Sequence, residues 1–181
     1  WVMQESYPNA TVGPRLFLST AGGAPGSFSE LTLTGVDPSD NWPWTTRLAV
    51  VDLGPGTPNA LFMGSDYLYR SSVDDPTSWT KVSADLFLGS QAVSDIEPVT
   101  VGDQVRLYLG SGMGFYFPGG PLTRVYRCDD AMAATPVLVD VTGDYPLGNV
   151  GDLAVDPNRP DRVYLARSEF GLSRLYLSEQ G

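Results

Sequence analysis

Short runs of alternating hydrophobic and polar residues make up most of this chain, with turn-forming residues between them. Two examples are YLYRSS at residues 67–72 and QVRLYLGS at residues 104–111. The runs have four to eight residues, are rich in Leu, Tyr and β-branched residues, and are bounded by Gly, Pro, Asp or Asn. This pattern predicts β-strands. No long run has the apolar spacing of an amphipathic helix, so we expect an all-β protein.

Four stretches of the chain resemble one another at a nearly constant spacing. They are centred on Phe17, Tyr69, Tyr126 and Tyr176, which lie 52, 57 and 50 residues apart. A period of this length, with several short strands in each unit, is typical of a β-propeller built from four-stranded antiparallel blades. A propeller is a scaffold for many functions, so the repeat predicts the architecture and not the activity.

The runs divide into four units that we interpret as blades of one propeller domain. Their expected bounds are 1–34, 46–83, 94–142 and 150–181. In the two central units we expect four strands, named A (innermost) to D (outermost), at 46–53, 59–65, 67–72 and 79–83, and at 94–101, 104–111, 124–130 and 136–142. The first unit supplies strands C and D, at 15–20 and 27–34, and the last unit lacks strand D. The total is about three and a half blades, fewer than the roughly four of the smallest common closed ring.

Incomplete blades leave strand edges that can pair with other chains. The sequence leaves three explanations open. The chain is part of a longer propeller, or two copies join into a ring of about seven blades. Alternatively, the segment that begins at Trp1 supplies the missing strand D of the last unit.

Charge and composition narrow the range of functions. The net charge is −10 and the chain has a single lysine, Lys81, so we expect no binding to nucleic acid. The absence of histidine excludes Ser-His-Asp and Cys-His catalysis and histidine metal ligands within this chain. Cys128, the one cysteine, has no partner for an intrachain disulfide. No apolar stretch approaches about 20 residues, so no membrane span is predicted.

One predicted turn carries a recognisable motif. Residues 72–79 read SVDDPTSW, which resembles the Asp-box S-x-D-x-G-x-T-W. Ser72, Asp74 and Trp79 match it, and we expect their side chains to cap and cover a tight turn between strands C and D. Degraded copies of the motif keep Asp130 in the next unit and Ser178 in the last.

Together with the stretch GDLAVDPNRPDRVYLARS at residues 151–168, these boxes resemble the BNR/Asp-box β-propeller superfamily. That superfamily includes sialidases, xyloglucanase-type glycoside hydrolases and sortilin-like receptor domains. The resemblance implies that Asp74 and Asp130 form turns and do not take part in catalysis. The arginine-containing F/Y-R-I-P motif of sialidases is absent, so sialidase activity is not expected.

Propeller topology places the D–A and B–C loops on one face, and these loops are rich in aromatic residues. Clustered exposed aromatic rings mark binding surfaces. We therefore expect a carbohydrate or protein ligand to contact this face through Trp42, Trp44, Phe115, Tyr116, Phe117, Tyr145 and Phe170. The alternative is that Trp42, Trp44, Phe115 and Phe117 belong to the core between the blades.

Charged residues also recur where the innermost strands begin. Alignment of the A strands places Arg47, Asp95 and Asp152 at equivalent positions, and Glu97 shares the face of Asp95. Paired carboxylates can hydrolyse a glycosidic bond, hold a structural cation, or cap the backbone amides at the start of the inner strands. The candidate catalytic residues are Asp95 and Asp152.

The sequence thus favours a non-catalytic, exported binding module that needs no cofactor and acts in an extracellular or periplasmic space. A polysaccharide-acting glycoside hydrolase is the first alternative. The second is an assembly subunit that joins a copy of itself, or another chain, through its open blade edges.

Overall fold

The computed structural model describes residues 2–4, 13–43, 45–87, 91–112, 123–145, 148–169 and 172–178. All regular secondary structure in these residues is β-strand, which confirms the all-β prediction. No helix that could cross a membrane is found in this part of the chain.

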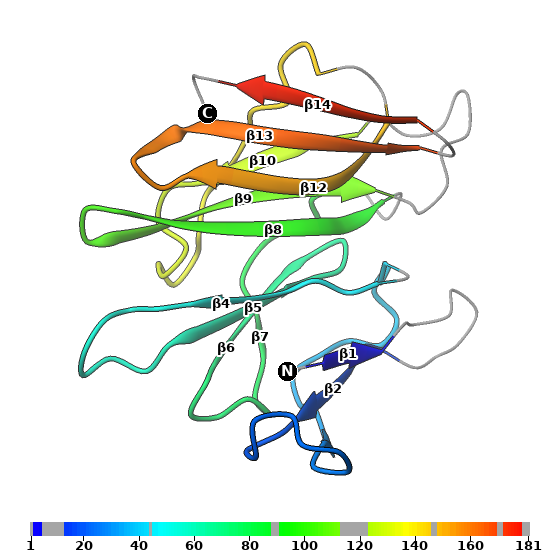
Figure 1. Ribbon diagram of the computed structural model, residues 1–181, viewed down its shortest axis with the longest axis vertical. Coiled ribbons are helices and arrows are strands. Elements are labelled where there is room, and N and C mark those ends of the chain that lie inside the picture. Colours follow the sequence, from blue (N-terminus) through cyan, green and yellow to red (C-terminus); the bar gives the residue numbers. More distant parts are fainter. Residues whose placement is uncertain are drawn as a thin grey trace.

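The strands form four antiparallel sheets, and each sheet is made from consecutive strands (Figure 1). The first contains β1 (Val2–Gln4), β2 (Arg15–Leu18) and β3 (Ser29–Leu31). The second contains β4 (Leu48–Val51), β5 (Ala60–Gly64), β6 (Leu68–Ser72) and β7 (Thr80–Lys81). The third contains β8 (Ala92–Val101), β9 (Gln104–Gly112), β10 (Val125–Cys128) and β11 (Leu138–Asp140). The fourth contains β12 (Asn149–Asp156), β13 (Arg159–Glu169) and β14 (Leu172–Ser178).

The strands predicted from the alternating runs overlap the observed ones, and the third and second sheets have the four expected strands. The first sheet departs from the prediction. β1 pairs with β2 through Val2 and Phe17, so it adds a strand to the N-terminal sheet. In this structure the segment that follows Trp1 therefore belongs to the first sheet, and the described part of the last sheet consists of β12, β13 and β14.

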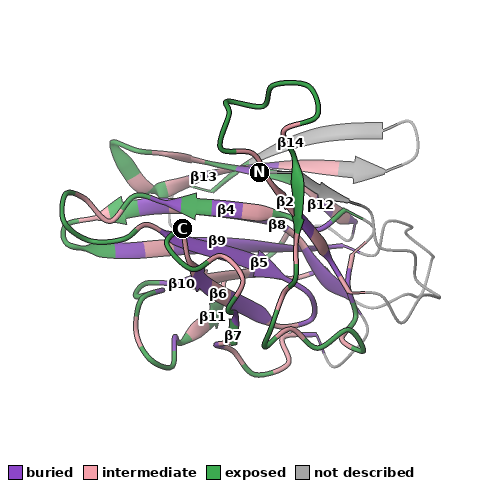
Figure 2. Cartoon of the chain, turned by 90° about the horizontal axis from the view of Figure 1, so that it is seen from below, coloured by how far each residue is buried: buried purple, intermediate pink, exposed green. Residues whose placement is uncertain are grey.

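The sheets follow one another along the long axis in chain order (Figure 1). A cluster of buried hydrophobic residues lies at each interface between neighbouring sheets. Leu16, Trp42 and Tyr69 belong to the core between the first and second sheets. Phe62 and Leu107 lie between the second and third, and Tyr108, Val150 and Leu165 belong to the core at the fourth. Buried residues concentrate on the central strands β5 and β9 (Figure 2).

Neighbouring sheets are joined by a repeated contact between a glycine and a valine. Gly64 ends β5 and faces Val93 of the next sheet, and Gly110 of β9 faces Val150 of the sheet after that. A methyl group at either glycine would overlap the valine side chain. The close approach also lets the Val93 amide donate to the Ser65 carbonyl at 2.8 Å. The absence of a side chain at Gly64 and Gly110 therefore allows the valine of the next sheet to lie directly against the backbone of β5 and β9.

Residues 72–79 form a hydrogen-bonded turn, although its bonds differ from the expected ones. The Ser72 hydroxyl accepts from the Asp74 amide at 3.2 Å, and Trp79 is buried and donates its indole N–H to the Pro76 carbonyl at 2.9 Å. The carboxylate bonded within the turn is that of Asp75, which accepts from the Thr77 hydroxyl at 2.8 Å, whereas Asp74 points to solvent.

The degraded copies of the motif lie at comparable places. Asp130 behaves as expected, since its carboxylate accepts from the Met132 amide at 3.3 Å. Ser178 ends β14, where it stands opposite Val163.

Candidate functional site

The carboxylates singled out in the sequence follow matching irregularities in two inner strands. The ladder between β8 and β9 shifts register between Val93 and Asp95, and the ladder between β12 and β13 shifts between Val150 and Asp152. Each β-bulge precedes an aspartate. Bulges redirect side chains and are common beside functional sites. The structure therefore confirms that Asp95 and Asp152 occupy equivalent positions.

Arg47 connects three sheets at this point. It directly precedes β4, and its guanidinium donates to the carbonyls of both bulge residues, Ser94 at 3.0 Å and Gly151 at 3.3 Å. Its Nε also lies 3.6 Å from Asp95 Oδ1. One arginine thus supplies donors to carbonyl groups that the bulges have removed from regular pairing.

Asp95 and Glu97 bond to the inner edge of the next sheet. Asp95 Oδ2 accepts from the Leu153 amide at 2.5 Å, and Glu97 accepts from the Val155 amide. The two acids are two residues apart on β8, and the two amides are two residues apart on β12. The carboxylates therefore take the place of a neighbouring strand along β12 and satisfy backbone donors there.

Burial dominates the electrostatics of these acids. It raises the pKa of Asp95, and nearby Asp152 raises it further, while the Leu153 amide and Arg47 act in the opposite direction. The pKa of Glu97 is also raised, again chiefly by burial. Asp152 differs from both, because it is exposed to solvent.

Of the three roles considered for this cluster, the contacts favour amide capping. The Asp95 side chain is 9% exposed, and its oxygens face an amide and an arginine, which leaves it poorly placed to transfer a proton to a substrate. No group of three acidic or cysteine side chains suited to a metal ion occurs among the described residues. The cation alternative gains no support from the geometry.

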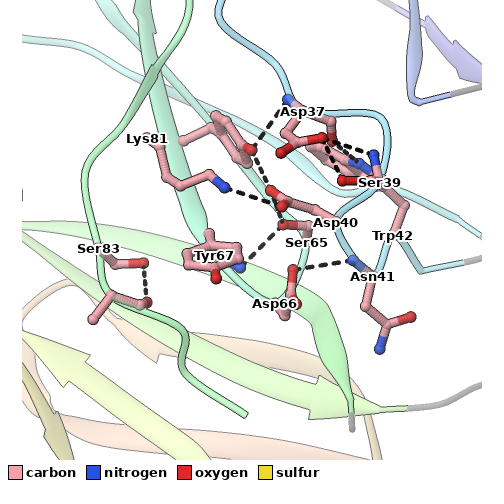
Figure 3. A network of polar contacts seen from close by, with 12 residues as sticks. Asp37, Ser39, Asp40, Asn41, Trp42, Ser65, Asp66, Tyr67, Lys81 and Ser83 are labelled. Atoms are coloured by element: carbon pink, nitrogen blue, oxygen red, sulfur yellow. Dashed lines mark hydrogen bonds and ion pairs between the residues drawn. The ribbon is translucent and has the colours of Figure 1, made fainter. Parts of the chain in front are cut away.

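A second polar cluster, here called the loop-face cluster, was not anticipated from the sequence (Figure 3). It lies on the face where the D–A and B–C loops were expected. Its central members are Asp40, Asp66, Tyr67, Tyr69 and Lys81. They come from the loop between β3 and β4, from the β5–β6 turn, and from β6 and β7.

Asp40 is the centre of this cluster. Its side chain is 7% exposed and lies 3.0 Å from the Lys81 amine, and it also accepts a hydrogen bond from the Tyr69 hydroxyl. The Lys81 Nζ lies 3.7 Å from the centroid of the Tyr67 ring, a cation–π geometry. The ammonium group is thus held between one carboxylate and one aromatic face, while the lysine side chain stays 31% exposed.

Asp66 connects the loop between β3 and β4 to the β5–β6 turn through a hydrogen bond. It accepts from the Asn41 amide at 3.1 Å, and Asn41 in turn donates to the Gln91 carbonyl at 3.1 Å. Burial raises the pKa of Asp66, with a smaller contribution from the negative charge of Asp40. Burial also raises the pKa of the half-buried Tyr67, and Asp85 is the next contributor.

The aromatic residues predicted to bind a ligand have different environments. Trp42 is 8% exposed, stacks on Tyr69 with ring centroids 5.3 Å apart, and donates its indole N–H to the Asp37 carbonyl at 3.0 Å. The expectation of an exposed ring at Trp42 is therefore corrected: the loop folds back and adds this ring to the core. Tyr145 is half-buried and packs against the core at the fourth sheet. The remaining predicted residues lie outside the described ones: Trp44, Phe115, Tyr116, Phe117 and Phe170.

Sequence reasoning missed the loop-face cluster because its members are far apart in the chain. Asp40 and Lys81 are separated by 41 residues, and neither belongs to a motif. The one available signal was composition, since the chain has a single lysine and that lysine falls in a predicted strand.

Comparison with known proteins adds no relative: no protein-family model, curated protein or solved structure matches this chain.

Proposed function

We propose that this chain is a non-catalytic β-propeller module that binds a carbohydrate through the loop-face cluster. The propeller architecture is supported by the meander order within each sheet and by the repeated glycine–valine contact between successive sheets. An exported location remains part of the proposal, based on the low lysine content and on the resemblance to Asp-box propellers.

The observation that carries the proposal is the prearranged surroundings of Tyr67. Its ring is half-buried, Lys81 covers it from one side, and the carboxylates of Asp66 and Asp85 are close enough to affect its pKa. Sugars offer C–H faces to aromatic rings and hydroxyl groups to charged donors and acceptors. Because Asp40 and Asp66 are held by bonds within the protein, the cluster needs little ordering when a ligand arrives.

The test is binding to a panel of neutral polysaccharides, measured by affinity electrophoresis and then by calorimetry with the oligosaccharide that binds best. We expect Tyr67→Ala to weaken binding about tenfold, a loss of about 1.4 kcal/mol. Phe28→Ala is the matched control, because Phe28 is a 40% exposed aromatic residue on the opposite loops and its loss should leave binding unchanged.

Two results would overturn the proposal. One is equal affinity in wild type and Tyr67→Ala. The other is release of reducing ends from a polysaccharide, abolished by Asp152→Asn, which would replace the binding module with a glycoside hydrolase.

A further inference from the structure

The outer edges of the second and third sheets can be compared position by position. In the second sheet Tyr69 pairs with Lys81 and Arg70 with Thr80. In the third, Tyr126 pairs with Asp140 and Arg127 with Val139. The inner ladders agree with this alignment, since Met63 faces Tyr69 and Leu109 faces Tyr126. Ser78 therefore corresponds to Val137, and Trp79 to Leu138.

In the second sheet this edge is covered by the chain itself. Thr34 lies beside Ser78 in a parallel bridge. Its amide donates to the Thr77 carbonyl at 2.8 Å, and its carbonyl accepts from the Trp79 amide at 2.9 Å. Gly35 follows with a φ of 76°, and a methyl group there would overlap the Trp79 carbonyl oxygen. The occupant is thus an extended segment with a glycine after its pairing residue.

In the third sheet the corresponding edge is open among the described residues, because β11 pairs with β10 alone. The Pro136 carbonyl and the Leu138 amide take the places of the acceptor and donor that Thr34 satisfies in the second sheet. Pro136 directly precedes Val137, is itself buried and lacks an amide proton, so the equivalent contact would need its carbonyl alone. An open edge with these groups is a template for an added strand.

The side chains at this edge are unusually apolar. Val137 is 73% exposed and Val139 is 45% exposed, whereas the covered edge has Ser78 and Thr80 at these positions. Asp140 is the only charged residue of β11, and Arg124 pairs with it at 3.2 Å. The chain has a net charge of −10, but the outer edge of β11 has no unpaired charged side chain.

We propose that the outer edge of β11 docks an extended, uncharged segment of a partner protein by parallel strand addition. The internal occupant of the second sheet defines the chemistry of the partner segment. Its pairing residue donates to the Pro136 carbonyl and accepts from the Leu138 amide, a glycine follows, and β-branched or leucine side chains cover Val137 and Val139.

The probe is the chain's own occupant sequence, an acetylated and amidated peptide of residues 31–36, LTLTGV. Titration into the isotope-labelled full chain should shift the amide resonances of Val137 and Leu138 with a dissociation constant in the millimolar range, about −4 kcal/mol. The control peptide has proline in place of the threonine that corresponds to Thr34. It lacks the donor for the Pro136 carbonyl and should not bind.

Two protein variants locate the site. Val137→Lys places a charge at the edge and should weaken peptide binding at least tenfold. Val50→Lys is the matched control, because Val50 is 46% exposed on β4 and should leave binding unchanged. Circular dichroism of both variants checks that the fold is retained.

Three outcomes of the peptide titrations would overturn the proposal. They are the absence of shifts up to the solubility limit of the peptide, equal binding by Val137→Lys, and equal binding of the proline peptide. Self-association of the chain that Val137→Lys abolishes, without binding of the peptide, would assign the edge to a second copy and would also reject the proposal. None of these outcomes bears on Tyr67, so this edge and the carbohydrate site fail or succeed separately.

Discussion

At the scale of single residues, Asp95 determines how stability responds to pH at the inner strands. Its raised pKa means that the folded protein holds this proton more tightly than the unfolded chain, whose value is about 3.9. The contribution of Asp95 to the free energy of unfolding is therefore largest below about pH 4 and falls as the pH rises through the folded pKa. Glu97 shifts in the same direction, so the two acids reinforce each other.

We expect Asp95→Asn to remove part of this pH dependence. The asparagine keeps an oxygen for the Leu153 amide but does not titrate. The difference in free energy of unfolding, wild type minus variant, should decline from about pH 4 toward pH 7. Urea unfolding at several pH values measures it. A difference that stays constant or increases with pH would contradict a raised pKa at Asp95.

At the scale of elements, the third and fourth sheets pack together where the Val150 side chain lies against Gly110. Gly110→Ala places a methyl group against Val150, and we expect a loss of about 1–3 kcal/mol in the free energy of unfolding. Val150→Ala alone should also destabilise, because it removes buried methyl groups.

The double variant tests whether the effects of the two substitutions on stability are coupled. Gly110→Ala with Val150→Ala should cost about 0.5–3 kcal/mol less than the two single losses combined, because the smaller side chain makes room for the methyl group. The control pair is Gly110→Ala with Val99→Ala, since Val99 is in the same core cluster but not among the close neighbours of Gly110. Equal additivity in both pairs would show that the contact with Val150 has no special role.

Apart from β1, the strands, their order and the equivalence of Asp95 with Asp152 could be predicted, because alternation and repetition are local properties of the sequence. For Trp42 the sequence left an exposed ring and a core position both open, since its burial depends on Tyr69, which lies in the next unit. The pairing of Asp40 with Lys81 and the bonds from β8 carboxylates to β12 amides also join distant segments. Such contacts follow from how the sheets stack, and no spacing rule in a single sequence contains that information.

At the scale of the whole molecule, the backbone hydrogen bonds of central and edge strands should not open equally often. β5 is fully buried and lies between β4 and β6, and β9 lies between β8 and β10. β3 and β11 are short, lie at outer edges and are largely exposed. The protection of backbone amides against hydrogen exchange should therefore be lowest at the outer edge of each sheet and highest at its centre.

Hydrogen exchange of the isolated chain should show this order. We expect the amides of β5 and β9 to exchange slowest and those of β3 and β11 to exchange fastest, by orders of magnitude. Mass spectrometry with peptide resolution is sufficient for the comparison. Protection of β11 equal to that of β9 would mean that another segment already covers its outer edge.

The position of Lys81 has a practical consequence for chemical labelling. It is the only lysine in the chain, and its amine lies between Asp40 and the Tyr67 ring. A reagent that acylates amines can therefore mark no other side chain, and it reaches this one more easily whenever the segment around Asp40 lifts from β6 and β7. The rate at which Lys81 is acylated therefore reports how often the loop-face cluster opens, and it can be measured from the mass of the proteolytic peptide that contains Lys81.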